Sequence, residues 1–408
     1  MKLPHKPQVC IIGLGYIGLP TAAILAHHGY QVRGVDINPK VVETINQGNI
    51  HIVEPDLEQL VADGIHNQRL TAGTTPVPSD IFIICVPTPF HKNTSNIPQP
   101  NIDYVIAAAQ SIAPVLQPGN LVILESTSPI GTTNQIEQIL KAAGAPHDIH
   151  LAYCPERVLP GHILQELIHN DRVVGGLTPQ ATALGKEFYQ SFCQGKILTT
   201  DARTAELCKL TENAFRDVNL AFANELSMLC PTLGVDVREL IQLANHHPRV
   251  NILQPGCGVG GHCIAVDPWF IAAADPENTP LIQTARKVND HKPDWVVTQI
   301  TSLAQNFQQQ NHRNATIACL GLAFKPNVDD LRGSPALEIT NKLSNLRYNV
   351  LPVEPNLKFH PSLDLVSWEI AVDKADIIVF LVKHREFLDI DTCEKPCLDF
   401  CGMDIEKR

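Results

Sequence analysis

The sequence is short of basic residues, of long apolar runs and of internal repeats, and each shortage argues against a class of protein. Among 408 residues, Lys and Arg number 31 and Asp and Glu 42, so the formal net charge is −11. This balance argues against a broad nucleic-acid-binding surface, although net charge leaves room for one cleft that binds a phosphorylated small molecule. The longest apolar runs, such as 377–382, fall far short of the roughly 18 residues of a membrane span. No period of roughly 20–50 residues indicates a solenoid or a propeller.

The sequence also lacks the marks of secretion. Residues 1–6 contain no apolar signal core. The 12 cysteines are scattered, and Cys10, Cys85 and Cys319 stand within apolar stretches. This distribution is typical of reduced, buried thiols rather than of a disulfide framework. We therefore expect a cytoplasmic protein that binds neither nucleic acid nor a membrane.

Strand-like and helix-like segments alternate in the first half of the chain. Short apolar runs indicate buried strands at 9–12, 31–36, 81–86, 121–124 and 150–153. Residues 20–28 indicate a helix between the first two strands. Continuous apolar strands that alternate with helices are typical of a parallel sheet covered on both faces.

A long helical segment separates this region from a second one of the same kind. Residues 203–233 have apolar side chains at a helical period, on one face formed by Leu207, Leu210, Ala214, Val218, Ala221, Phe222 and Leu229. A Gly/Pro-rich loop and a polar stretch follow, and strand patterns resume at 316–322, 350–353, 376–382 and 398–400. The predicted fold is α/β, with two doubly wound Rossmann-like domains joined by a long central helix.

A glycine motif, G-L-G-Y-I-G, connects the first predicted strand to the first helix. Its glycines would permit a tight turn, a close approach of backbone to a pyrophosphate, and the packing of helix on strand. An acid that ends the second strand would bind the ribose hydroxyls and repel a 2′-phosphate, which favours NAD over NADP. A plain glycine-rich turn is the alternative. The residues predicted to bind the dinucleotide are Gly13, Gly15, Tyr16, Ile17, Gly18 and Asp36.

Two further turns follow buried strands, where ligands of such sheets collect. They contain Thr88 and Thr127, which we predict to bind the cofactor through their hydroxyl groups. Ordinary Thr-Pro and Ser-Pro turns are the alternative.

A glycine-rich loop at 256–263 ends in Cys263, and Asp267 follows four residues later. Glycines leave a thiol accessible, and a nucleophilic thiol needs access and a lowered pKa. We expect Cys257, in the same loop, to be a small buried hydrophobe. No complete set of metal ligands accompanies the thiols at Cys393, Cys397 and Cys401, so we expect no metal site.

Cations that could act beside such a thiol lie on the long helix and after it. Lys209, Asn213 and Arg216 form a polar stripe, for which a solvated helix face is the alternative. His247 and Arg249 precede the glycine loop, where they form either a surface turn or part of an anion site.

Together these residues resemble the UDP-glucose/GDP-mannose dehydrogenase family over nearly the whole chain. Especially specific segments lie at 153–161, 206–213, 260–263 and 324–332. The resemblance implies a four-electron oxidation of a sugar C6 alcohol to a carboxylate, with two NAD⁺ and one water. It implies that Cys263 forms a thiohemiacetal and then a thioester, that Asp267 activates the hydrolytic water, and that Lys209 assists proton transfer and, with Asn213, stabilises the oxyanion.

The same resemblance implies the substrate contacts and the assembly. The nucleotide sugar would be bound by Arg157, Val158, Lys209, Asn213, Arg216, His247, Arg249, Gly260 and Lys325, and Arg332 would lie near the cofactor. The family is dimeric or larger through the long helix, so we expect a homo-oligomer in which Arg249 reaches across the interface. The implied domains are an NAD-binding domain at 1–200, a central dimerisation and catalytic-loop domain at 201–310, and a UDP-sugar-binding domain at 311–408.

Departures from the family pattern bear on the sugar. Arg157 follows Glu156 where relatives that act on UDP-glucose have Phe, and 160–161 replace a second acid. These departures favour an N-acetylated sugar, UDP-N-acetyl-D-mannosamine first, with UDP-GlcNAc and UDP-glucose as alternatives, for surface polysaccharide synthesis. Val266 and Cys401 stand where relatives often have Lys. Rival hypotheses are a two-electron β-hydroxyacid dehydrogenase and a nucleotide-sugar-binding regulator without turnover.

Overall fold

The computed structural model describes residues 6–91, 97–159, 161–392 and 394–403. Contacts group the chain into two compact units, Met1–Thr211 and Glu212–Arg408. Helix α8 (Ala202–Leu233) belongs to both units and confirms the predicted long central helix. The division into three domains at 200 and 310 stays a prediction.

The first unit is built on a sheet whose described strands follow the order β3-β2-β1-β4-β5-β6-β7-β8. All neighbouring strands are parallel except β6 and β7, which are antiparallel. The five predicted strands are confirmed, whereas β3, β7 and β8 were not predicted. The strands are β1 (Gln8–Ile12), β2 (Gln31–Val35), β3 (Leu70–Gly73), β4 (Ile81–Ile84), β5 (Leu121–Leu124), β6 (His150–Tyr153), β7 (Arg172–Gly176) and β8 (Ile197–Asp201).

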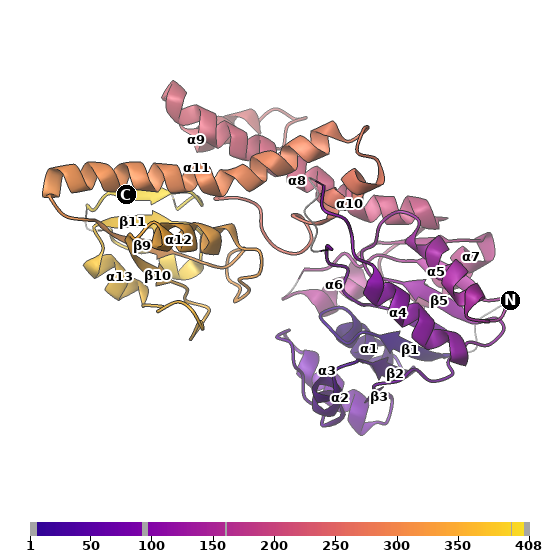
Figure 1. Ribbon diagram of the computed structural model, residues 1–408. Helices are drawn as coiled ribbons and strands as arrows, with labels where there is room; N and C mark the ends of the chain where they lie inside the picture. The colour runs from indigo at the N-terminus through magenta and orange to yellow at the C-terminus, as the bar shows by residue number, and fades with distance from the viewer. Residues whose placement is uncertain (1–5, 92–96, 160, 393, 404–408) are drawn as a thin grey trace. The chain divides into compact units, whose positions relative to one another are not determined.

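Apolar cores lie on both faces of this sheet, because successive side chains of a strand point to opposite faces. Val9 and Ile11 pack in one core and Cys10 in the other. Residues of α1 (Gly18–His27), α2 (Pro39–Asn46), α3 (Leu57–His66), α6 (Ile163–His169) and α7 (Pro179–Gln190) pack in the first core. Residues of α4 (Asp103–Ile112), η1 (Ala113–Val115) and α5 (Thr132–Ala142) pack in the second (Figure 1).

The second unit contains a parallel sheet with strand order β10-β9-β11-β12 among the residues described. Its strands are β9 (Thr316–Leu320), β10 (Asn349–Val353), β11 (Ile377–Phe380) and β12 (Cys397–Asp399), all of them predicted. One face is covered by α11 (Pro280–Asn311) and α12 (Pro335–Asn345), which pack together, and the other by α13 (Trp368–Lys374) and η2 (Arg385–Phe387). The remaining helices are α9 (Val237–Ala244) and α10 (Asp267–Ala274).

Two long helices differ from their sequence patterns. In α8, the apolar residues expected on one face are divided: Leu210 and Ala221 are buried, but Phe222 is 52% and Leu229 49% exposed. Helix α11 continues to Asn311, so most of the polar stretch noted from sequence is helical. The amphipathic pattern of α11 is weakened by its many Gln and Asn residues and by Pro293, which explains why sequence alone did not predict it.

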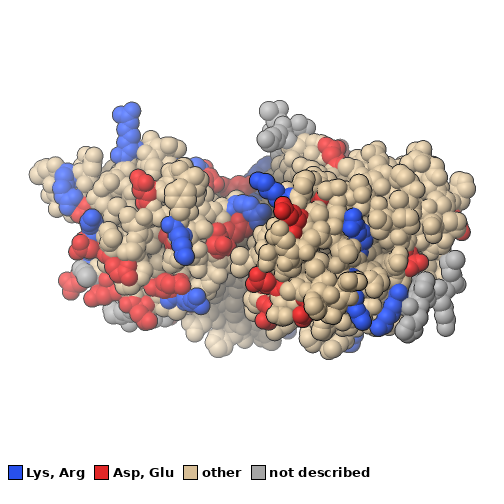
Figure 2. Space-filling model, turned by 90° about the horizontal axis from the view of Figure 1, so that it is seen from below, with Lys and Arg blue, Asp and Glu red and all other residues tan. Residues whose placement is uncertain are grey.

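The mixed surface charge and the reduced thiols are the properties that the composition indicated. Figure 2 shows Lys and Arg interspersed with Asp and Glu on the face drawn. None of the described cysteines is in a disulfide. Within the part of the chain that the structure describes, no helix combines the length and the apolar character needed to cross a membrane.

Lys292 of α11 is a buried amine whose polar contacts are neutral groups. It is 1% exposed, its Nζ donates to Ser227 Oγ at 2.7 Å, and Nζ lies 3.9 Å from the centre of the Trp295 ring. Burial lowers the pKa of Lys292 to about 7 because the charged form loses its hydration. In the unfolded chain this amine regains its ordinary pKa near 10.4.

The stability of the second unit is therefore expected to rise with pH through Lys292. Between about pH 7 and 10 the unfolded chain binds a proton that the folded chain does not, so raising the pH favours the folded state. Between pH 7 and pH 9, the free energy of unfolding should rise by about 2 kcal/mol more in the wild type than in Lys292→Met. Urea unfolding followed by tryptophan fluorescence measures it, because the 3 tryptophans, Trp269, Trp295 and Trp368, all lie in this unit. Equal pH dependence in the two proteins would contradict the assignment.

Candidate functional site

The glycine motif lies between β1 and α1, as predicted, and each glycine has its own geometric reason. Gly13 has φ +94°, and a Cβ there would lie 2.4 Å from the Cys85 carbonyl oxygen. A Cβ at Gly18 would lie 1.8 Å from the Gly13 carbonyl oxygen. A Cβ at Gly15 would meet no atom within 4 Å, so this position is open toward a ligand. The turn therefore fits a dinucleotide pyrophosphate.

Asp36 lies directly after β2, beside the glycine turn. Its Oδ2 accepts from the Leu14 N–H at 3.1 Å and its Oδ1 from the Asn38 N–H at 2.9 Å. These bonds fix the carboxylate where a ribose would lie next to the glycine turn. Tyr16 is 39% exposed and Ile17 is half-buried at the start of α1. The structure thus brings all six residues of the predicted dinucleotide site together.

Thr88 and Thr127 also lie close together, at the carboxyl ends of β4 and β5. Thr88 Oγ1 donates to the Thr127 carbonyl at 2.5 Å, and Val86 N–H donates to Ser126 Oγ at 2.9 Å. The Thr88 hydroxyl proton therefore joins the two turns, as the plain-turn alternative predicts. The Thr88 hydroxyl oxygen can still accept a hydrogen bond. Cofactor binding by both threonines stays a prediction.

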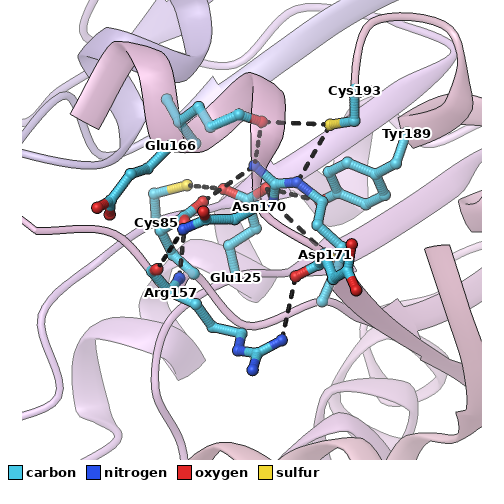
Figure 3. A network of polar contacts seen from close by, with 12 residues as sticks. Cys85, Glu125, Arg157, Glu166, Asn170, Asp171, Tyr189 and Cys193 are labelled. Atoms are coloured by element: carbon cyan, nitrogen blue, oxygen red, sulfur yellow. Dashed lines mark hydrogen bonds and ion pairs between the residues drawn. The ribbon is translucent and has the colours of Figure 1, made fainter. Parts of the chain in front are cut away.

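The segment that contains Arg157 and Val158 is held in place from several sides (Figure 3). The Arg157 N–H donates to Glu156 Oε1 at 2.6 Å, and its Nη1 donates to the Asp171 carbonyl at 3.0 Å. Asn170 Nδ2 donates to the Arg157 carbonyl at 3.0 Å. The predicted substrate segment is thus fixed to the start of β7.

A buried guanidinium, Arg172, lies behind this segment and was not identified from sequence. It is 4% exposed, its Nη2 pairs with Glu156 Oε2 at 3.2 Å, and its Nη1 lies 3.9 Å from Glu125 Oε1. Tyr189 donates to Glu125 at 2.6 Å. Burial raises the pKa of Glu125, although Arg172 opposes the rise. Two buried acids, Glu125 and Glu156, therefore share one buried cation.

Thiols around this network have the environment of structural residues. Cys85 Sγ donates to Glu125 at 3.2 Å. Burial raises the pKa of Cys85 well above its ordinary value and that of Cys154 to about 12, so both stay protonated at neutral pH.

The thiol predicted to be the nucleophile has a different environment. Cys263 is exposed, and its carbonyl accepts from the Asp267 N–H at 2.8 Å, one turn before α10. Asp267 is 2% exposed, and its Oδ2 accepts from Asn213 Nδ2 of α8 at 2.5 Å. The second unit thus brings together Cys263, Asp267 and Asn213, and the solvated-face alternative is wrong for Asn213. Cys257 is buried as expected, which raises the pKa of its thiol to about 12.

The glycine loop lies against the segment that follows β9. A Cβ at Gly260 would be 2.4 Å from the Gly333 carbonyl oxygen, and one at Gly261 would be 3.0 Å from the Phe324 ring. Lys325 follows Phe324 and is half-buried, and Arg332 precedes Gly333 and donates to Asp330 at 2.8 Å. Gly260, Lys325 and Arg332 are therefore neighbours within the second unit.

The other predicted residues lie on helix and loop surfaces. Arg216, His247 and Arg249 are exposed in the second unit. Lys209 is half-buried on α8, one turn before Asn213, and belongs with Arg157 and Val158 to the first unit. Convergence of the two sets of residues on one substrate stays a prediction. Among the residues described, no group of three or more acids, histidines or cysteines has a geometry that could hold a metal ion, and Cys393 lies outside them.

Comparisons with known proteins agree with this geometry. Sequence models of the UDP-glucose/GDP-mannose dehydrogenase family match the chain as NAD binding domain at residues 7–193, central domain at 203–291 and UDP binding domain at 318–397. An NDP-N-acetyl-D-galactosaminuronic acid dehydrogenase from Ralstonia nicotianae is 53% identical over 418 residues, covering 98% of this chain and 97% of that protein.

Two further similar proteins are named as dehydrogenases of UDP-N-acetyl-D-mannosamine. A UDP-N-acetyl-D-mannosamine dehydrogenase from Escherichia coli K12 is 52% identical over 398 residues, covering 93% of this chain and 94% of that protein. The structure of a UDP-D-ManNAc dehydrogenase from Pyrococcus horikoshii has a TM-score of 0.89 at 37% identity, covering 97% of this chain and 96% of that chain. With its dinucleotide turn, its second sheet and these matches, the chain belongs to the UDP-glucose/GDP-mannose dehydrogenase family and is an NAD-dependent nucleotide-sugar dehydrogenase.

Proposed function

We propose that the protein oxidises the C6 alcohol of UDP-N-acetyl-D-mannosamine to a carboxylate through a covalent intermediate on Cys263. The observation that carries the proposal is the arrangement of an exposed thiol one turn before a buried carboxylate, Asp267, which Asn213 holds in place. Two relatives named as UDP-N-acetyl-D-mannosamine dehydrogenases support the choice of sugar.

The first oxidation needs a group that takes the proton of the C6 hydroxyl. Lys209, or a water near Asp267, would accept it, while NAD⁺, when bound, accepts the hydride in each of the two oxidations. The glycine turn at 13–18 and Asp36 would bind the pyrophosphate and the ribose. The product of this step is an aldehyde.

The second oxidation needs the aldehyde to be held. The Cys263 sulfur would add to its carbonyl carbon, and the thiohemiacetal oxygen would lie near Lys209 and Asn213. Loss of the second hydride leaves a thioester. Asp267 would then take a proton from the water that attacks the thioester, which releases the carboxylate and restores the thiol. The Asn213 bond orients Asp267 for this role.

The sugar is the finest part of the proposal. Arg157 fits an N-acetylated sugar better than UDP-glucose, and the Ralstonia relative's name makes an N-acetylgalactosamine nucleotide a further alternative beside UDP-GlcNAc and UDP-glucose. We also propose a cytoplasmic enzyme that supplies surface polysaccharide synthesis, with the three domains and the site residues expected from sequence.

A row of exposed apolar side chains supports the proposed homodimer. On α8, Phe215 is 68%, Phe222 52% and Leu229 49% exposed, at intervals of seven residues. Leu233 is 64% exposed, and the half-buried Leu226 is seven residues before it. Apolar residues repeated every seven positions form a heptad seam, and pairing of two α8 helices along this seam would bury them on both helices. A second copy of the chain is the partner that this self-complementary row fits.

The reaction is tested by the NADH released with UDP-ManNAc, UDP-GlcNAc, UDP-GalNAc and UDP-glucose. We expect UDP-ManNAc to have the highest kcat/KM and to yield two NADH per sugar. Cys263→Ser should still bind the nucleotide sugar but lose acid formation by at least about 100-fold, because the serine hydroxyl is a far weaker nucleophile. One NADH per sugar, or undiminished acid formation by Cys263→Ser, would refute the proposal.

The homodimer is tested by the molar mass in solution. Phe222→Asp places a charge in the seam and should convert dimer to monomer at micromolar concentration, measured by light scattering after size exclusion. Phe359→Asp, at a side chain that is 75% exposed in the segment between β10 and α13, is the matched control and should stay dimeric. A dimeric Phe222→Asp protein or a monomeric wild type would contradict the proposed seam.

A further inference from the structure

Residues 249–266, the loop that carries Cys263, contain no helix or strand. Its backbone groups therefore need partners other than a helical or sheet ladder. Side chains of α8 supply them: Asn219 Oδ1 accepts from the Leu253 N–H at 3.1 Å, and Asn224 Oδ1 accepts from the Gly256 N–H at 3.0 Å. Together with the bond from Asn213 to Asp267, these contacts hold the loop on both sides of the thiol.

The orientation of the Asn224 amide is dictated by groups behind it. Asp217 Oδ1 accepts from Arg286 Nη1 at 2.5 Å and from Asn289 Nδ2 at 2.8 Å. With its nitrogen committed to Asp217, Asn289 has only Oδ1 left to accept from Asn224 Nδ2, at 2.9 Å. Asn224 Oδ1 therefore faces Gly256. All four side chains are nearly or completely buried, so water does not compete for these bonds.

The loop beyond Gly256 has little freedom to absorb a shift. A Cβ at Gly258 would lie 2.9 Å from Pro335, and one at Gly260 would lie 2.4 Å from the Gly333 carbonyl oxygen. Such close packing on α12 and the preceding turn leaves the backbone no room to move toward them. A displacement at Gly256 would therefore have to move the loop away from α12, and this loop includes the segment that leads to Cys263.

We propose that Asn224 is a positioning residue for the covalent steps, because it fixes the loop that presents Cys263 to the aldehyde. The inference rests on the proposed function of Cys263. Asn224 touches no reacting atom and acts through Gly256, with Asn289 and Asp217 setting its orientation. Misplacement of a nucleophile by about 1 Å costs about 100-fold in rate.

Asn224→Ala tests the inference through the fate of the aldehyde. We expect kcat to fall about 100-fold while KM for the nucleotide sugar and for NAD⁺ changes less than about threefold. The ratio of aldehyde, trapped with hydroxylamine, to acid should rise, since a misplaced thiol captures the aldehyde less often than it escapes. Asn289 has no bond to the loop and acts through Asn224, so Asn289→Ala should change kcat and the aldehyde-to-acid ratio in the same direction but less.

Thr340→Val is the matched control for a general loss of stability in the same unit. Thr340 is fully buried and donates to the Ala336 carbonyl at 2.9 Å, a bond within α12 that involves no loop residue. At equal folded fraction, judged by tryptophan fluorescence, it should keep the native aldehyde-to-acid ratio. The inference is overturned if Asn224→Ala keeps the native kcat and the native aldehyde-to-acid ratio. If Asn224→Ala does not fold, the same result for Asn289→Ala overturns it. Acid formation by Cys263→Ser would instead overturn the proposed function, whatever Asn224→Ala does.

Discussion

The chemistry proposed for this protein depends on the hydrogen bond between Asn213 Nδ2 and Asp267 Oδ2. A carboxylate that is 2% exposed is costly to bury unless donors satisfy it. Asn213 supplies one, and the position of Asp267 at the first turn of α10 adds the favourable end of a helix dipole. The Asp267 N–H also donates to the Cys263 carbonyl. The Asn213 bond that holds Asp267 therefore also fixes one end of the loop that carries Cys263.

Burial distinguishes Cys263 from the other thiols. Cys257 and Cys319 lie in apolar cores, where the pKa of each rises to about 12, and Cys85 stands beside a buried acid that raises its pKa further. A protonated thiol without solvent access is a poor nucleophile. Cys263, by contrast, is exposed. Among the cysteines that the structure describes, Cys263 is exposed and the others are buried or half-buried.

Local sequence signals predicted the parts of the fold that depend on local physics. Strands such as β4 and β5 are uninterrupted apolar runs, and a Cβ at Gly13 or Gly18 would clash with a backbone carbonyl oxygen. Strand β8 escaped prediction because only two of its five residues, Ile197 and Leu198, are apolar, so it lacks the continuous apolar run of a buried strand. Arg172, Arg286 and Asn224 were not identified from sequence, since nothing nearby in the sequence reveals the distant acids and amides that allow their burial. Long-range pairing is the information that one sequence does not display.

The most direct test of the covalent mechanism is to stop the reaction at the thioester. In Asp267→Asn the group proposed to activate water is lost while the side-chain volume is kept, so the acyl-enzyme should accumulate during turnover. Acid quench followed by peptide mass spectrometry should find the nucleotide-sugar acyl group on the peptide that contains Cys263. Release of two NADH per sugar with no adduct, or with the adduct on another residue, would contradict the account.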